Sequence, residues 1–191
     1  MPDHQPSHSH SHGHSQVAED MLTVEEALER ILASFLPLEP EEKPLLDCLG
    51  QVLASAAKSP LDLPPLANSG MDGYAVLQSD IRGASGKTPK LLKVIGTVAA
   101  GHVSSQRVRP GTAIRIMTGA PIPEGADTVV PFEETDEVER RRAGQTLDEI
   151  NVTSDLPVYC NIRPSGEDVQ RGQLVLEAGT LIRAAEVGVL A

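Results

Sequence analysis

Residues 64–76 read Pro-Pro-Leu-Ala-Asn-Ser-Gly-Met-Asp-Gly-Tyr-Ala-Val, and core packing alone does not require these residue types. The two prolines fix φ on the approach, and the polar segment 68–70 that follows is typical of a loop. Asp72-Gly73 is a strong turn dipeptide, and residues 74–76 have the composition of a strand. The stretch predicts a loop that presents one carboxylate. On local chemistry alone, the simpler interpretation is a hairpin turn in which Asp72 caps its own backbone.

Two later stretches accompany this one. Residues 115–121 read Arg-Ile-Met-Thr-Gly-Ala-Pro, and residues 161–169 read Asn-Ile-Arg-Pro-Ser-Gly-Glu-Asp-Val. In order and spacing, the three stretches resemble the signatures of the MoeA-type molybdopterin molybdenumtransferases, the family that includes the gephyrin E domain. The resemblance runs from about Leu22 to the last residue, and three motifs in register are far more specific than one short pattern. Gly70 stands where the family usually has Ala, a departure that leaves Asp72 in place.

The composition limits the classes of function. The chain has 191 residues, of which 40% are hydrophobic, enough to build a core. With two Phe, two Tyr and no Trp, that core must be aliphatic, and stacking platforms for nucleic acid are not expected. The net charge of −11 argues against a nucleic-acid surface or an anionic-membrane surface. No apolar run approaches the roughly 20 residues of a membrane span, and no signal-peptide pattern is present, so we expect a cytoplasmic protein.

The first 20 residues contain five of the six histidines, separated mainly by Ser, Gly and Pro. Such a tract cannot bury a core, and we expect it to be disordered. One interpretation is loose binding of late first-row divalent metals by the imidazoles of His8, His10, His12 and His14. The alternative is an inert tail.

The elements expected downstream are short. A capping box at Thr23 and Glu26, followed by apolar residues at helical spacing, predicts a helix over 24–35 that Pro37 ends. A short helix within 45–54 leads to an extended piece near residues 57–59.

β-Branched runs bounded by Gly or Pro predict strands of a small β barrel or sandwich at residues 91–95, 113–116 and 128–130. The acidic segment 133–139, followed by three arginines at 140–142, predicts an exposed hairpin or loop with a solvated surface.

Near the end of the chain we expect a strand at 173–177 and the beginning of a helix within 181–191. The predicted fold class is α+β. Its parts are a His-rich tail (1–20), an elongated helical and extended α/β linking domain (21–63 and 156–180), an inserted small β-barrel-like domain (64–155), and the first residues of a truncated α/β domain (181–191).

The resemblance implies an enzyme of molybdenum cofactor biosynthesis that takes molybdate and adenylylated molybdopterin, releases AMP and uses Mg²⁺. It also implies a homodimer formed through the elongated domain, an upstream molybdopterin-adenylating enzyme, and a downstream domain that supplies much of the pterin and molybdate site. No nucleic-acid or membrane partner is expected. The alternatives are a noncatalytic dimerisation or scaffolding module of the same fold, and a metal-binding protein that works through its His tail.

The resemblance also assigns roles to residues. Asp72, Thr118 and Asp168 are the expected catalytic residues, and Asp72 is also the expected Mg²⁺ ligand because this ion prefers one or two carboxylates together with phosphate and water. The expected cofactor-binding residues lie in the same three motifs: Ser69, Arg115, Gly119, Arg163 and Glu167.

Local chemistry leaves an alternative for several of these residues. Thr118 is equally suited to capping its own turn. Arg115 is equally suited to pairing with an acidic surface as to a phosphate. Glu167 and Asp168 are adjacent, and we expect one of them to face the site and the other to be solvated.

Overall fold

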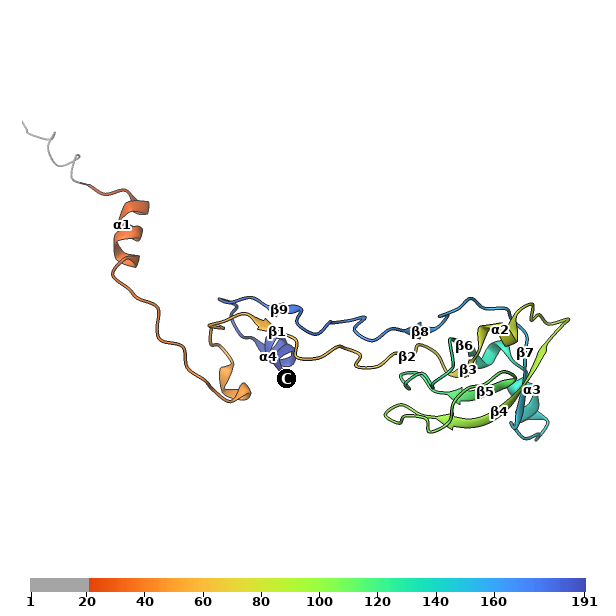
Figure 1. The fold of residues 1–191 in the computed structure, drawn as a ribbon. Helices are drawn as coiled ribbons and strands as arrows, with labels where there is room; N and C mark the ends of the chain where they lie inside the picture. Colours follow the sequence, from red (N-terminus) through yellow and green to blue (C-terminus); the bar gives the residue numbers. More distant parts are fainter. Residues whose placement is uncertain (1–20) are drawn as a thin grey trace, which may run out of the picture. The chain divides into compact units, whose positions relative to one another are not determined.

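The computed structural model describes residues 21–191 (Figure 1). These residues divide into two units, one ending at Lys43 and one beginning at Pro44. No helix within the described residues is long and apolar enough to cross a membrane.

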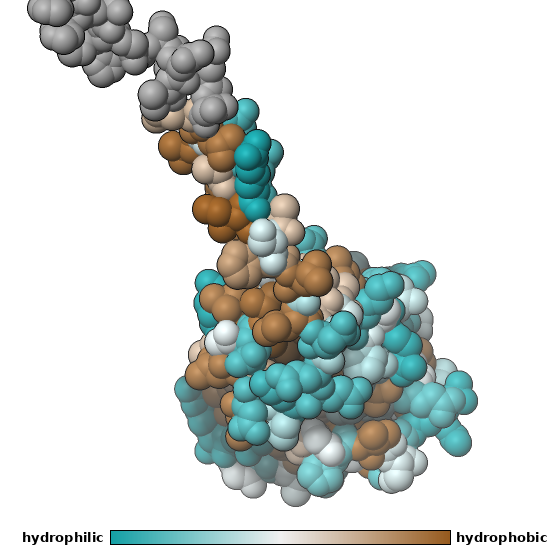
Figure 2. Space-filling model, turned by 90° about the vertical axis from the view of Figure 1, so that its left-hand side faces the viewer, coloured by the Kyte–Doolittle hydropathy of each residue, from teal (hydrophilic) through white to brown (hydrophobic). Residues whose placement is uncertain are grey.

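The first unit contains helix α1, Val24–Leu32. The predicted capping box is confirmed: the Thr23 backbone N–H donates to Glu26 Oε2 at 2.9 Å, and the Glu26 backbone N–H donates to Thr23 Oγ1 at 3.2 Å. The helix ends at Leu32 with Ala33 as its C-cap, before Phe35. Its apolar stripe is exposed within this unit, and Figure 2 shows it as brown side chains along one side, opposite teal polar ones.

The second unit is built around a five-stranded sheet with the order β6-β3-β5-β4-β7. Only the β4–β5 pair is parallel. The predicted β runs are confirmed as strands. The sheet comprises β3 (Gly73–Val76), β4 (Lys90–Val98), β5 (Thr112–Ile116), β6 (Thr128–Pro131) and β7 (Glu149–Val152).

The sheet curls until its two outer strands approach each other. Thr135, which follows β6 by four residues, forms a bridge with Val152 of β7, and the Thr153 backbone N–H donates to Glu134 O at 3.0 Å. Three short helical segments border the sheet: α2 (Gln78–Ile81), η2 (Phe132–Glu134) and α3 (Glu137–Arg142).

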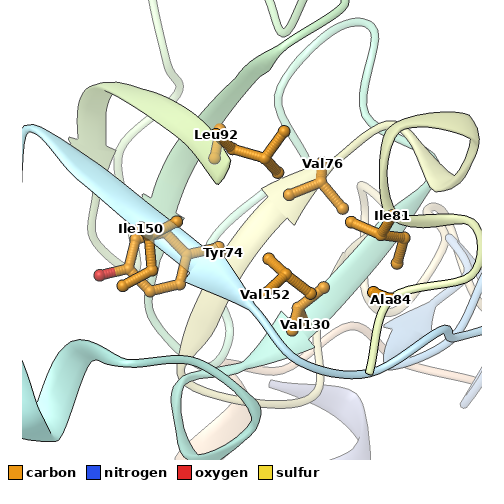
Figure 3. Close-up of a cluster of buried hydrophobic side chains, with 9 residues drawn as sticks. Tyr74, Val76, Ile81, Ala84, Leu92, Val130, Ile150 and Val152 are labelled. Atoms are coloured by element: carbon orange, nitrogen blue, oxygen red, sulfur yellow. The ribbon is translucent and has the colours of Figure 1, made fainter. Parts of the chain in front are cut away.

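The core inside the curl is aliphatic, as the composition predicts. One cluster, drawn in Figure 3, gathers side chains from all five strands and from α2, and it includes Tyr74, which is fully buried. Its other labelled members are Val76, Ile81, Ala84, Leu92, Val130, Ile150 and Val152. A second cluster is formed by the residues of β3 and β5 that alternate with those of the first cluster. It contains Ala75, Ile114 and Ile116. Alternation along β3 and β5 thus buries both of their faces.

The rest of the unit pairs the segment before the sheet with the segment after it. β1 (Ala57–Lys58) pairs with β9 (Leu174–Leu176), and β2 (Asn68–Ser69) pairs with β8 (Ile162–Arg163), both antiparallel. Beyond β1 and β9 lie η1 (Leu45–Cys48) and α4 (Ala184–Leu190). Two chain segments about a hundred residues apart therefore run side by side (Figure 1).

The prediction for the acidic and basic block at 133–142 is wrong. The segment forms η2 and α3 instead of a hairpin or loop, and Glu137 is buried with 2% of its surface exposed. Its carboxylate accepts hydrogen bonds from Tyr74 Oη at 2.6 Å, from the Arg115 guanidinium at 2.8 to 3.2 Å, and from Arg141 Nε at 2.8 Å. A buried charge is tolerated here because several donors surround it.

These donors also set the protonation of the cluster. Burial alone would raise the pKa of Glu137, but hydrogen bonds from Arg115, Tyr74 and Arg141 outweigh it and lower that pKa to about 2. Burial, together with the hydrogen bond to Glu137, raises the pKa of Tyr74 above its ordinary value of 10. The stable form of the cluster is an ionised Glu137 beside a neutral Tyr74.

We predict that Gly73→Ala strongly destabilises the second unit. A Cβ at Gly73 would lie 2.0 Å from the backbone oxygen of Val130, so β3 and β6 would have to separate. We expect a loss of at least about 3 kcal/mol in the free energy of unfolding, because the atoms that the Cβ would meet belong to the backbone of Val130 and Pro131 and not to a flexible side chain. Urea denaturation followed by circular dichroism measures it.

Gly70→Ala is the matched control. A Cβ at this position would lie 3.5 Å from Asn161 O and 3.9 Å from Arg163 Cγ, which are ordinary contact distances. Its stability should stay within about 1 kcal/mol of the wild type or rise slightly. Equal losses in the two variants would show that the close approach of β3 and β6 is not what requires Gly73.

We predict that Glu137→Gln flattens the acid limb of the stability profile. The folded pKa of Glu137, about 2, lies below the ordinary 4.5, so its ionisation favours folding. That contribution is fully present above pH 4.5 and is lost as pH falls through the folded pKa near 2. The free energy of unfolding should therefore fall more steeply with acid in the wild type than in the variant. Parallel acid limbs in urea denaturation would contradict this assignment.

Candidate functional site

The two-residue strand β2 brings the three motifs together. On one side, the Gly119 backbone N–H donates to Ser69 O at 2.8 Å, and the Ser69 N–H donates to Ala120 O at 2.9 Å. On the other side, β2 pairs with β8, and the Gly70 N–H donates to Asn161 O at 2.9 Å. The first motif thus lies between the second and the third.

Asp72 and Thr118 meet at this junction. Asp72 Oδ1 accepts a hydrogen bond from the Thr118 backbone N–H at 2.7 Å and another from Thr118 Oγ1 at 2.8 Å. The interpretation of Asp72-Gly73 as a hairpin turn is wrong: Gly73 begins β3, and Asp72 caps the second motif instead of its own backbone. Of the three predicted catalytic residues, these two are in direct contact.

The pKa of Asp72 is lowered. The hydrogen bond from the Thr118 backbone contributes most, followed by the one from the Thr118 hydroxyl. Both donors stabilise the charged form. Asp72 is therefore a carboxylate at neutral pH, suited to holding a cation or orienting a hydroxyl, and it is not a proton donor there.

Backbone geometry presents Thr118 at the surface. The Ala120 N–H donates to Met117 O at 2.9 Å, and Gly119 between them has φ +78°, a conformation that favours glycine. Thr118 is exposed, although its hydroxyl is directed to Asp72. The alternative in which Thr118 caps its own turn does not describe its side-chain hydrogen bond.

Ser69 shapes the loop before Asp72. Its hydroxyl donates to Met71 O at 2.5 Å and accepts from the Met71 N–H at 3.2 Å. Ser69 is 1% exposed. A contact between Ser69 and a cofactor stays a prediction, since in this conformation the hydroxyl is satisfied inside the loop.

Arg163 is bonded to both acidic residues of the third motif. Its Nε donates to Glu167 Oε2, and its Nη2 donates to Asp168 Oδ1 at 2.8 Å and to Oδ2 at 3.0 Å. All three side chains are exposed by 41% or more. Both carboxylates share one guanidinium, and the expectation that one of them faces the site while the other is solvated stays a prediction. No hydrogen bond within residues 21–191 joins Asp168 to Asp72.

The turn of the third motif is anchored to the first. Ser165 Oγ donates to Pro65 O at 3.0 Å, and the Gly166 N–H donates to Pro64 O at 2.9 Å. Gly166 has φ +72°, and a Cβ there would lie 3.3 Å from Asp62 Oδ1. The prolines that precede the Asp72 loop therefore also position Glu167 and Asp168.

Arg115 is bonded to protein acceptors. Its guanidinium makes a salt bridge of 2.8 Å to Glu137, and its Nη1 lies 3.3 Å from Met117 Sδ. The alternative that pairs Arg115 with an acidic group is the observed one, with a buried partner in place of a surface partner. The two groups are half of a network that sequence reasoning missed, because nothing local marks Glu137 among its acidic neighbours.

The donor set around Asp72 offers Mg²⁺ a single carboxylate ligand. No group of three or more His, Cys, Asp or Glu in residues 21–191 is arranged to hold a metal ion. Asp72 Oδ1 is bonded to Thr118, and within this described part no hydrogen bond reaches Oδ2. One carboxylate oxygen fits an ion that completes its shell with phosphate and water. His8, His10, His12 and His14 lie outside the described residues, and metal binding by the tail stays a prediction.

Comparison with known proteins agrees with the motifs. The family described as MoeA N-terminal region (domain I and II) matches residues 22–191. A protein of Mycobacterium tuberculosis (strain CDC 1551 / Oshkosh) named molybdopterin molybdenumtransferase 2 is 37% identical over 164 residues, covering 85% of this chain and 38% of that protein. A molybdopterin molybdenumtransferase of Synechococcus elongatus is 38% identical over 177 residues, covering 88% of this chain and 42% of the relative.

A solved structure has the same fold. The crystal structure of the molybdopterin biosynthesis moeA protein from Pyrococcus horikoshii OT3 superposes with a TM-score of 0.76 at 35% identity. The match covers 87% of this chain and 42% of that one. The present chain therefore spans about two fifths of the length of these relatives. It belongs to the MoeA family, in the part described as the N-terminal region (domain I and II).

Proposed function

We propose that this chain is the N-terminal part of a molybdopterin molybdenumtransferase, in which Asp72 and Thr118 contribute one half of the site where molybdate and adenylylated molybdopterin react. The observation that carries this proposal is the Asp72–Thr118 pair, with bonds of 2.7 and 2.8 Å, at the place where the three motifs converge. The names of the relatives support a role in molybdenum cofactor biosynthesis. The substrates and the release of AMP belong to the proposal.

The chemistry of the pair suits a phosphoanhydride substrate. An ionised Asp72 holds the Thr118 hydroxyl in one orientation, which directs its oxygen lone pairs outward as acceptors. The exposed turn around Gly119 permits a ligand to approach backbone atoms closely. Mg²⁺, held by Asp72 Oδ2, would supply charge neutralisation of the phosphate oxygens.

The third motif supplies a second polar group. Arg163 between Glu167 and Asp168 has a net negative neighbourhood, so an anionic substrate would have to displace one carboxylate to use this guanidinium. We propose that Asp168, the more exposed of the two at 58%, is the group that exchanges partners. Arg115 is assigned to the buried network, and a direct phosphate contact by Arg115 would require breaking it.

The remainder of the site is expected from outside this chain. We propose the domain organisation stated above, with residues 21–63 and 156–180 as a linking domain, 64–155 as an inserted β domain and 181–191 as the start of an α/β domain. A homodimer, an upstream molybdopterin-adenylating enzyme and a cytoplasmic location are part of the same proposal. The alternative is a scaffolding module of the same fold, for which the exposed apolar stripe of α1 is the supporting observation.

We predict that Asp72→Asn abolishes most turnover without unfolding the protein, in a chain completed with its downstream region. Asparagine keeps the size of the side chain and one acceptor oxygen for Thr118, but it removes the charge. Loss of a positioned charged group at a reaction site costs about two orders of magnitude or more in rate. AMP release from adenylylated molybdopterin, with molybdate and Mg²⁺ present, measures it.

Two controls accompany this measurement. Thermal unfolding of the same preparation must show a similar folded fraction. The 191-residue chain by itself should release no AMP above the no-protein rate. Full activity in a folded Asp72→Asn enzyme would remove Asp72 from the reaction.

A further inference from the structure

A buried carboxylate joins the two strands that lead into the site. Tyr74 on β3 and Arg115 on β5 are direct cross-strand partners. The Tyr74 hydroxyl donates to Glu137 at 2.6 Å, and the Arg115 guanidinium donates to the same carboxylate through Nε and Nη2, the latter at 2.8 Å. One side chain from α3 thus bonds both members of one rung of the sheet.

This rung is the last before the site with a side chain on both strands. The β3–β5 ladder has three residue pairs, and the pair nearest the site joins Gly73 to Ile116. Gly73 has no side chain, and a Cβ there would collide with Val130 O at 2.0 Å. Contacts between opposite side chains fix the register of a short ladder. Near the site, that task falls to Tyr74 and Arg115.

The predicted catalytic residues lie directly beyond the rung. Asp72 is the residue before Gly73, and Thr118 is two residues after Ile116. Arg115 also reaches toward Thr118, because its Nη1 contacts the sulfur of Met117 at 3.3 Å. A continuous set of contacts therefore runs from Glu137 through Arg115 to the residue that precedes Thr118.

We propose that Glu137 is a positioning residue for the Asp72–Thr118 pair. By bonding Tyr74 to Arg115, it fixes β3 against β5 so that the Asp72 carboxylate and the Thr118 N–H and hydroxyl face each other. By occupying the Arg115 guanidinium, it leaves the Asp72 carboxylate to Thr118. This role rests on the proposed function only in taking that pair as part of the site. Glu137 itself, 2% exposed, contacts no substrate.

The test uses Glu137→Gln in the full 191-residue chain, observed by ¹⁵N nuclear magnetic resonance. Gln keeps the shape of the side chain and loses its charge, so the hold on Arg115 weakens. We expect the chemical shift of the Thr118 amide to differ from its wild-type value. We also expect this amide to exchange with solvent at least about tenfold faster, relative to the amides of β4 and β7, because the hydrogen bond between the charged groups of Glu137 and Arg115 no longer stabilises the strands that carry the pair.

Glu186→Gln is the matched control. Glu186 is also buried, at 8% exposed, and accepts from an arginine, Arg183, at 2.7 Å, but it lies on α4 and contacts neither β3 nor β5 through a hydrogen bond in the described residues. This variant should leave the Thr118 shift and relative exchange rate unchanged. A change at Thr118 equal to that in Glu137→Gln would overturn the specific role.

A merely structural Glu137 gives a different result. It would accelerate exchange of all the sheet amides by one common factor and leave the Thr118 chemical shift in place, and that outcome refutes the proposal. If Glu137→Gln does not fold, Tyr74→Phe removes one hydrogen bond while keeping the buried ring, and it is judged by the same comparison of Thr118 with β4 and β7. Neither measurement uses activity. A fully active Asp72→Asn enzyme would therefore refute the proposed role of Asp72 in the reaction without changing this result.

Discussion

The pairing of strand β2 on both of its sides is the constraint on which the site depends. Asn68 and Ser69 form a strand of only two residues, yet their backbone contacts reach residues 119–121 on one side and residues 162–163 on the other. Buried backbone groups need partners, and here those partners come from motifs that lie about fifty and a hundred residues away. The pairing of β2 therefore places Asp72 beside the turn that carries Thr118.

The strands beyond β2 extend that constraint into the core. Gly73 permits β3 to approach β6 more closely than any side chain would allow, and Tyr74 then meets Arg115 across the sheet. The network around Glu137 is costly to bury, and it is tolerated because Tyr74, Arg115 and Arg141 all donate to it. Polar groups in the interior often specify one arrangement where aliphatic packing would accept several. In this unit the specified arrangement is the one that aligns the two motifs.

Much of the fold was predictable from local pattern. The capping box at Thr23 and the β runs in β4, β5 and β6 depend on residues close in sequence, and they are confirmed. The prediction for residues 133–142 was wrong because a charged composition indicates a solvated surface, and the distant donors that bury Glu137 cannot be recognised from the local sequence. Tyr74 is 63 residues before Glu137, and no local signal connects them.

The site was predictable only in part, because its motifs are local but the contacts between them are not. The motifs identified Asp72 and Thr118, but their mutual hydrogen bonds span 46 residues and follow from the pairing of β2. Local chemistry assigned Asp72 to its own turn, since an Asp before a Gly usually caps nearby backbone. Arg163 was expected to meet an anion, and it meets the protein's own carboxylates within five residues. Tertiary pairing decided the first case, and a neighbouring charge decided the second.

The central claim is that the Asp72 carboxylate accepts a hydrogen bond from the Thr118 amide and thereby joins two of the motifs. Scalar coupling across that hydrogen bond, between the Thr118 amide nitrogen and the Asp72 carboxylate carbon in the labelled chain, tests it most directly. A bond of 2.7 Å predicts a resolved correlation and a Thr118 amide protected from exchange. A Thr118 amide that exchanges as fast as those of an unfolded chain, with no such correlation, would contradict the account.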